Sequence, residues 1–201
     1  AQERVFYLPN YYPTDFKSKE FDIADKEHID ISCFGAIRPL KNHLMQAFAA
    51  IEFADQIGKK LRFHVNAGRI EMQGGPVISN LKSVFQQLYK SGHELINHQW
   101  RPRHEFLDLC AEMDIGMQVS FSETFNIVGA DLISQGVPLI GTASEIPWSV
   151  KRYCADPVDS RSMIEKLHLV CSEPHYNVRS HQDRLQKYSE ETAAIWTKYF
   201  S

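Results

Sequence analysis

Short apolar runs alternate with longer stretches of helical period along this chain of 201 residues. The short runs are typical of strands, and residues that favour turns separate them. We expect strands at 5–8, 29–34, 61–65, 94–96, 115–119 and 137–140. The periodic stretches predict helices at about 42–54, 76–88, 103–113 and 125–134, while the polar residues 14–28 predict a surface connection.

Strands that alternate with helices pair in parallel, because each helix carries the chain back to the start of the next strand. We therefore expect an α/β fold, with a Rossmann-like, doubly wound parallel sheet and helices on both faces. Residues 1–201 are expected to form one such domain. Ligands of these sheets bind at the carboxyl ends of the strands, where the strand order reverses.

Helical period dominates after Pro147. Residues 158–170 predict one helix, and about 179–200 predict a terminal amphipathic helix. An apolar stripe on such a helix must dock on another surface. Two surfaces are open at this point: the sheet of this domain, and a neighbouring domain.

The composition is that of an ordinary globular protein, with 43% hydrophobic and 23% charged residues and a net charge of −3. This charge gives no broad basic field, so we expect no nucleic-acid partner. No apolar run is long enough to span a bilayer, so we expect at most a peripheral membrane association, made through another domain. The four cysteines form no Cys-x-x-Cys pair, which favours buried thiols in a reducing compartment, and we expect a cytoplasmic protein.

Residues 122–141 carry the most chemical information. A helix is predicted to begin near Phe125, with a serine or threonine just before it as the cap. The free N–H groups at a helix start, together with the helix dipole, bind phosphate. We expect the amides of Phe125, Asn126 and Ile127 to face a crevice at the edge of the sheet.

Two acids, Glu123 and Asp131, accompany this helix start. Asp131 is predicted about two turns into the helix, roughly 10 Å along its axis. A carboxylate there can reach a ribose diol while the helix start holds a diphosphate. The alternative is a capping acid at Glu123 and a solvated Asp131 on an ordinary helix, and the spacing leaves both open.

The same residues resemble the acidic motif of the retaining GT-B glycosyltransferases of family 4. The resemblance rests on Glu123, Phe125, Asn126, Asp131 and the Gly-Val-Pro-Leu-Ile run at 136–140. Three other segments resemble motifs of that family in the same order. They are 8–10 (its interdomain segment), 34–42 (its glycine and lysine loop) and 112–115 (the start of the strand before the acidic motif).

This resemblance implies a domain that binds a nucleotide diphosphate sugar and serves a sugar-transfer reaction. The family requires no metal or other cofactor, because basic side chains and helix amides neutralise the diphosphate. Lys41, six residues after Gly35, is implied to stabilise the departing diphosphate. Arg38 is expected to substitute for the family arginine, which is Ala36 here.

The resemblance implies further contacts with the donor. Glu123 is expected to face the donor sugar, and with Lys41 and Arg38 it completes the expected catalytic set. The base is expected near 97–100, beside Gln99 and Trp100, although Trp100 also fits a core or rim position. Gly35 is expected to let the backbone approach the ligand closely.

The acceptor-binding N-terminal domain of the family has no counterpart in residues 1–201. We therefore expect it elsewhere in the protein or in a partner chain, with little activity in its absence and with the terminal helix returning to it. Two alternatives remain. Ala36 and Asp131 depart from the family pattern and suit a non-catalytic nucleotide-binding module, and any fold can serve as an interaction domain.

Overall fold

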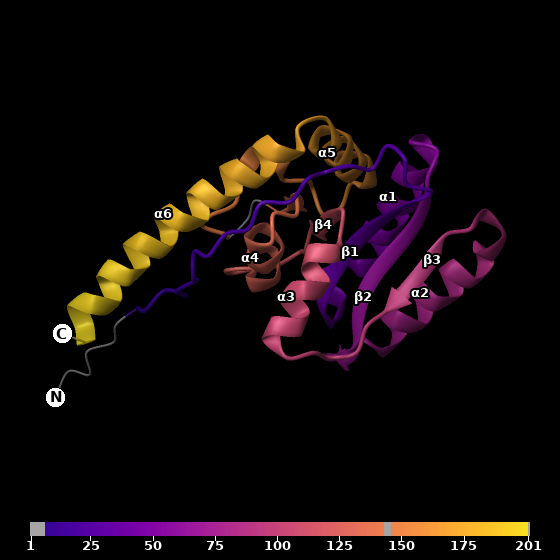
Figure 1. Cartoon of the computed structure of the whole chain (residues 1–201). Helices are drawn as coiled ribbons and strands as arrows, with labels where there is room; N and C mark the ends of the chain where they lie inside the picture. Colours follow the sequence, from indigo (N-terminus) through magenta and orange to yellow (C-terminus); the bar gives the residue numbers. More distant parts are fainter. Residues whose placement is uncertain (1–6, 143–145, 201) are drawn as a thin grey trace.

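A computed structural model of the chain describes residues 7–142 and 146–200. Five parallel strands form one sheet in the order β3-β2-β1-β4-β5, so the strand order reverses between β1 and β4 (Figure 1). The strands are β1 (His28–Ile37), β2 (Lys60–Ile70), β3 (Glu94–Asn97), β4 (Ile115–Gln118) and β5 (Leu139–Gly141). The expected doubly wound α/β fold is confirmed.

Six α-helices and three short 3-10 helices accompany the strands in the part of the chain that the structure describes. The α-helices are α1 (His43–Gln56), α2 (Gly75–Gln87), α3 (Arg103–Glu112), α4 (Ile127–Ser134), α5 (Ser160–Ser172) and α6 (Pro174–Phe200). The 3-10 helices are η1 (Pro39–Lys41), η2 (Tyr89–Ser91) and η3 (Lys151–Tyr153).

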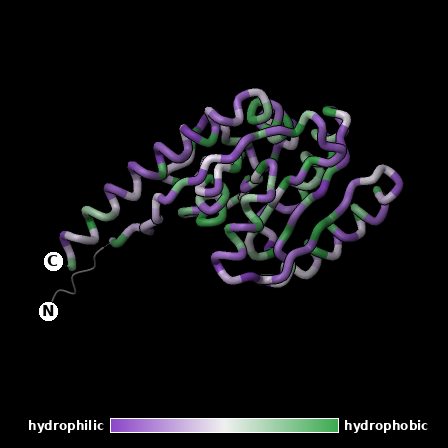
Figure 2. The backbone as a smooth tube through the Cα atoms, viewed as in Figure 1, coloured by the Kyte–Doolittle hydropathy of each residue, from purple (hydrophilic) through white to green (hydrophobic). Residues whose placement is uncertain are grey.

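The helices cover both faces of the sheet. On one face α1, α2 and α5 pack in an apolar core that contains Ile31 and Phe53. On the other face α3, α4 and α6 pack in a second core that contains Phe34 and Leu132. Figure 2 shows hydrophobic segments concentrated in the body of the domain, whereas α6 is largely hydrophilic where it leaves that body. Along β1, Ile29, Ile31 and Cys33 reach the first core and Phe34 reaches the second, because neighbouring side chains of a strand point to opposite faces.

The strand predicted at 5–8 is not formed by Tyr7 and Leu8, and Val5 and Phe6 lie outside the described residues. Residues 14–27 form no helix or strand and none of them is buried, as expected for a surface connection, but the segment is also held to the body at single points. Tyr12 is buried in the second core, and the backbone N–H of Lys17 donates to the carbonyl of Ser134 at 2.7 Å. These contacts join residues far apart in the chain, so the local sequence pattern does not predict them.

The β2 strand runs five residues beyond its predicted end and carries a bulge. Strands β1 and β2 pair Ala36 with Asn66 and then Ile37 with Ile70. Residues 67–69 therefore have no counterpart on β1. A bulge redirects side chains, and this one lies at the carboxyl end of the sheet.

The terminal helix α6 has 27 residues, roughly 40 Å in length. It begins five residues earlier than predicted. Its first half packs on this domain, with Leu185 in the second core, and its last turns extend beyond the body beside the N-terminal segment (Figure 1).

No helix among the described residues is long and apolar enough to cross a lipid bilayer. All four cysteines are free thiols. Cys33 and Cys110 are buried, and Cys154 and Cys171 are partly buried, as the sequence predicts.

The side chain of Asn177 ties α6 to the edge of the sheet. Its Oδ1 accepts from the N–H of Leu139 at 2.9 Å, and its Nδ2 donates to the carbonyl of the same residue at 3.0 Å. We expect Asn177→Ala to lower the free energy of unfolding by about 2–4 kcal/mol, because it leaves two buried backbone groups unpaired. Urea denaturation measures this. Asn80→Ala, at an exposed position of α2, is the control. Equal effects of the two substitutions would show that the hydrogen bonds of Asn177 do not stabilise the fold.

Stability should also depend on pH through buried histidines. Burial lowers the pKa of His181 from 6.5 to about 4, although its hydrogen bond to the carbonyl of Asn177 opposes this. Between these values the unfolded chain binds a proton that the folded protein does not, so the free energy of unfolding falls as the pH falls. We expect His181→Gln to reduce this slope by about 1.4 kcal/mol per pH unit near pH 5 to 6. Urea denaturation at several pH values measures the slope, and an unchanged slope in His181→Gln would contradict this prediction.

Candidate functional site

Two adjoining cavities lie at the carboxyl ends of the strands, where the strand order reverses. The larger has a volume of about 460 Å³ and the smaller about 270 Å³. Both are lined by Gly35, Trp100, Ile127 and Val128. Both cavities therefore lie where ligands of doubly wound sheets bind.

The larger cavity brings together most of the predicted site residues. These are Gly35, Arg38, Lys41, Trp100, Glu123, Phe125, Asn126 and Ile127. Asp131 lines the smaller cavity. Gln99 is exposed and lines neither cavity; its side chain lies beside Gly68.

Lys41 is placed by the turn between β1 and α1. It ends η1, and Asn42 then adopts a left-handed conformation (φ 59°) as the N-cap of α1, where the sequence predicts a helix start. The carboxamide of Asn42 donates to the carbonyls of Val119 and Pro157, at 3.2 and 2.8 Å. These bonds fix the turn against the end of β4, and Lys41 with it.

Lys41 and Glu123 form an ion pair on the cavity wall. Only 10% of the Lys41 side chain and 9% of the Glu123 side chain are exposed, so the charges have little water around them. Burial first, and the Arg38 guanidinium second, lower the pKa of Lys41, and the Cys33 thiol opposes this in part. An anionic ligand in this cavity would meet a cation that is already placed and only partly hydrated.

The start of α4 lines the same cavity. Its cap is Asn126, not a preceding serine or threonine, and the side chain of Asn126 accepts from the N–H of Gly129 at 2.9 Å. Because the helix begins at Ile127, two residues later than predicted, the amides of Ile127 and Val128 lead its first turn. The amide Nδ2 of Asn126 is buried with no hydrogen-bond partner among the described residues.

Asp131 is neither solvated nor free. It lies one turn into α4, roughly 6 Å along the axis, and only 3% of its surface is exposed. Its Oδ1 accepts from the hydroxyl of Tyr12 at 2.7 Å and pairs with the guanidinium of Arg103 at 2.9 Å. Burial raises the pKa of Asp131, while these two partners oppose the rise.

Gly35 and Asn66 shape the junction of the two cavities. Gly35 has φ 113°, a conformation that only glycine adopts without strain, and its N–H donates to Asn66 Oδ1 at 3.1 Å. Trp100 stands on the rim with 65% of its surface exposed, which excludes a core position and leaves its ring free to meet a ligand. The guanidinium carbon of Arg69 lies over its ring, 5.4 Å from the ring centroid.

Sequence reasoning missed five residues of this site: Tyr12, Asn66, Arg69, Glu71 and Arg103. Tyr12 and Arg103 reach Asp131 from segments 119 and 28 positions away. Arg69 and Glu71 follow a strand end, which was the available signal, but the strand was predicted to end at 65. Only the tertiary fold collects these side chains.

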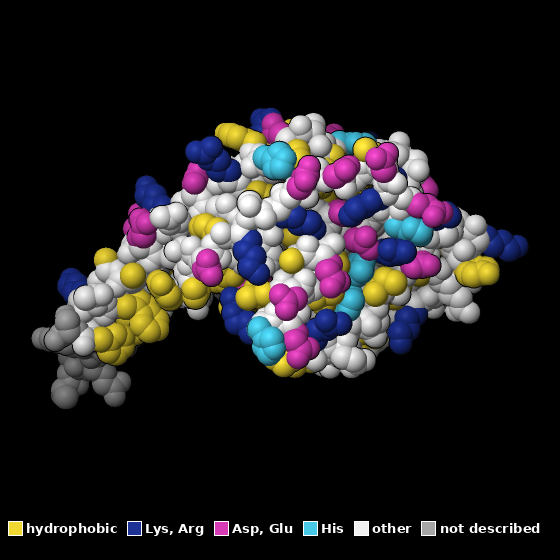
Figure 3. All heavy atoms as spheres, in the orientation of Figure 1, with side chains coloured by type: hydrophobic (Ala, Val, Ile, Leu, Met, Phe, Trp, Pro, Cys, Tyr) yellow, Lys and Arg dark blue, Asp and Glu magenta, His cyan; other side chains and the backbone are white. Residues whose placement is uncertain are grey.

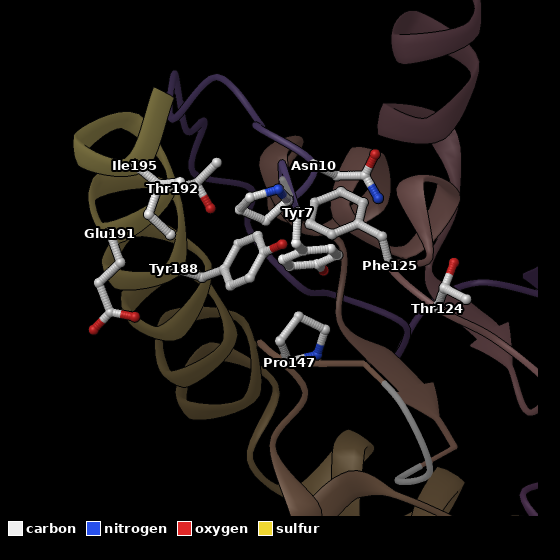
Figure 4. Close-up of a pocket in the computed structure, with 10 residues that line it drawn as sticks. Tyr7, Asn10, Thr124, Phe125, Pro147, Tyr188, Glu191, Thr192 and Ile195 are labelled. Atoms are coloured by element: carbon white, nitrogen blue, oxygen red, sulfur yellow. The ribbon is translucent and has the colours of Figure 1, made fainter. Parts of the chain in front are cut away.

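A third cavity, of about 500 Å³, adjoins the larger one through Asn10, Thr124 and Phe125. It lies between the N-terminal segment, the loop at Pro147 and α6. Figure 4 shows the rings of Tyr7, Tyr188 and Phe125 gathered around it. In the described residues, no group of three or more His, Cys, Asp or Glu side chains is arranged to hold a metal ion.

No protein-family model matches this chain, and no curated protein matches it. Solved structures match its fold. A UDP-forming α,α-trehalose-phosphate synthase from Burkholderia xenovorans matches with a TM-score of 0.69 and 12% identity, over 87% of this chain and 44% of that chain. The synthase from Burkholderia multivorans matches with a TM-score of 0.69 and 9% identity, over 87% and 41%.

A trehalose-6-phosphate synthase from E. coli, bound with UDP-2-fluoro glucose, matches with a TM-score of 0.66 and 11% identity, over 86% of this chain and 44% of that chain. The chain thus spans less than half the length of these enzymes. Its fold is that of one Rossmann-like domain of the GT-B glycosyltransferases.

The Tyr12 hydroxyl should stabilise the protein through Asp131. We expect Tyr12→Phe to lower the free energy of unfolding by about 1–2 kcal/mol, because a buried carboxylate loses one of two partners. Tyr11→Phe, at a neighbouring residue that is 52% exposed, should change it by less than about 0.5 kcal/mol. Denaturant unfolding compares the two, and a Tyr12→Phe effect as small as that of Tyr11→Phe would show that the bond is unimportant.

Proposed function

We propose that this chain is the donor-binding domain of a retaining, family 4-like glycosyltransferase, which transfers a sugar from a nucleotide diphosphate sugar to an acceptor. The observation that carries the proposal is that the buried Lys41–Glu123 pair and the start of α4 line one cavity. A cation and helix amides around one cavity suit a bound diphosphate.

The two cavities suggest how the donor lies. The diphosphate occupies the larger cavity, between Lys41 and the amides of Ile127 and Val128. The nucleoside extends into the smaller cavity, past Gly35 toward Trp100. Both contacts of Asp131 use Oδ1, so Oδ2 is the oxygen that we assign to the ribose diol.

In this arrangement Lys41 stabilises the negative charge that develops on the departing diphosphate. Arg38 lines the same cavity and adds a second positive charge, so the reaction is proposed to proceed without a metal ion. Glu123 holds the Lys41 ammonium in place and faces the donor sugar.

The acceptor is proposed to bind to a second domain, in the same protein or in a partner chain. Support comes from the exposed apolar residues Ile195, Trp196 and Phe200 at the outer end of α6, where hydrophobic side chains gather in Figure 3. The indole N–H of Trp196 donates to the carbonyl of Pro9 at 2.9 Å and fixes this end of the helix. The length of the matched structures also leaves room for such a domain.

Calorimetry with UDP-, GDP- and ADP-sugars tests donor binding. We expect at least one of them to bind, and Lys41→Ala to weaken its binding by about tenfold or more, because a charged hydrogen bond to phosphate is lost. Lys90→Ala, at an exposed position in η2, is the matched control. No binding at millimolar donor would overturn the proposal.

A double variant separates the two roles of Lys41. Lys41→Ala leaves Glu123 without its cation, and the bare carboxylate would itself repel a diphosphate. In Lys41→Ala/Glu123→Gln that repulsion is absent. Binding that stays weak in the double variant assigns the contact to Lys41; full recovery would show that Lys41 only neutralises Glu123.

A hydrolysis assay separates transfer chemistry from binding alone. A donor domain with catalytic groups should slowly hydrolyse its sugar nucleotide, and Lys41→Ala should abolish this. Tight binding without hydrolysis, also after addition of an acceptor domain, would favour a non-catalytic binding module. The alanine at position 36, where the family has an arginine, is the observation that supports this alternative.

A further inference from the structure

Five charged side chains line the larger cavity, and their pairing is uneven. Lys41 is paired with Glu123, whereas Arg38 and Arg69 share Glu71. Arg38 Nη1 lies 4.0 Å from Glu71 Oε2, and Arg69 contacts Oε1 through Nε. Two guanidinium groups on one carboxylate leave a positive excess on this wall.

Arg69 reaches the cavity because of the bulge in β2. Residues 67–69 have no counterpart on β1, and they turn toward the segment that follows β3. The N–H of Ala67 donates to Asn97 Oδ1 at 2.8 Å, and the N–H of Gly68 donates to the carbonyl of His98 at 3.4 Å. The bulge is therefore anchored on its far side.

Gly68 makes this anchoring possible. A Cβ atom at Gly68 would lie 2.7 Å from the backbone nitrogen of Trp100, a distance that no side chain tolerates. Close backbone contact at Gly68 brings the next residue, Arg69, over the face of Trp100, with its guanidinium carbon 5.4 Å from the ring centroid.

A guanidinium over an indole face is attracted to the ring, while its N–H groups remain available for hydrogen bonds. Two of these N–H groups can donate to two oxygens of one phosphate, in bidentate geometry. Trp100 borders both cavities, so Arg69 stands where the proposed nucleoside and diphosphate positions meet.

We propose that Arg69 is a diphosphate-binding residue, which Glu71 and Trp100 hold in place until the ligand arrives. The ligand's phosphate oxygens then replace the Glu71 carboxylate as partners of the guanidinium, which stays over the Trp100 ring. This inference rests on the proposed function, because it concerns the same donor.

Substitutions of Arg69 and of Glu71 are expected to change the diphosphate affinity in opposite directions. In calorimetry of the full chain with UDP, GDP and ADP, we take the diphosphate that binds most tightly. Arg69→Ala should weaken its binding by about tenfold to a hundredfold, through loss of charged hydrogen bonds. Glu71→Gln should tighten binding by about two- to fivefold, because the competing carboxylate is removed.

Arg161→Ala is the matched control, since 89% of that side chain is exposed on α5, at the other face of the sheet. Its affinity should equal that of the unsubstituted protein. A general folding defect cannot produce the tightening expected from Glu71→Gln, so the two variants guard against that explanation.

The outcomes separate the two proposals. If the unsubstituted protein binds a nucleoside diphosphate while Arg69→Ala binds as tightly as Arg161→Ala, the role of Arg69 is overturned and the proposed function stands. Weaker binding by Glu71→Gln also counts against Arg69, since it would make the carboxylate a ligand partner. If none of the three diphosphates binds to the unsubstituted protein, both proposals fail.

Discussion

Two buried amide side chains at the start of α1 hold the site together. Gln46 accepts from the N–H of Val119 at 2.8 Å and donates to the carbonyl of Lys41 at 2.8 Å. Asn42 donates to the carbonyl of Val119. The end of β4 and the turn after β1 are thereby joined across the point where the strand order reverses. The position of Lys41 relative to Glu123 depends on this junction, because it joins the turn that carries Lys41 to the segment that leads to Glu123.

The junction also explains how two charges remain buried together. An isolated ammonium or carboxylate with so little exposure would be costly, and pairing offsets much of that cost. Lys41 and Glu123 come from the two segments that Asn42 and Gln46 connect, so their pairing follows from the backbone arrangement. The ion pair is poorly suited to add stability. It keeps a charged group ready at a cavity wall.

The second cavity rests on a different kind of constraint. Tyr12, Arg103 and Asp131 come from the N-terminal segment, α3 and α4, and they meet in one buried network. The network ties the docked N-terminal segment to the floor of the cavity. A carboxylate that the sequence presents as a ligand group is thus also part of the packing, and its two oxygens have different surroundings.

The sequence by itself determined the alternation of strands and helices, the doubly wound class, the helix start at Asn42 and the grouping of Gly35, Lys41 and Glu123 at one edge of the sheet. These features depend on local periodicity and on the rule that parallel strands end at the same edge. Only the tertiary structure decided that the segment around Tyr12 is docked, that β2 continues through a bulge to Ile70, and that Arg69 and Arg103 reach the cavities. Gln99 was also predicted at the cavity, but only the next residue, Trp100, lines it, and the local sequence does not decide which of the two side chains faces the cavity. Such contacts join residues far apart in the chain, and their energies depend on packing and burial that no local pattern records.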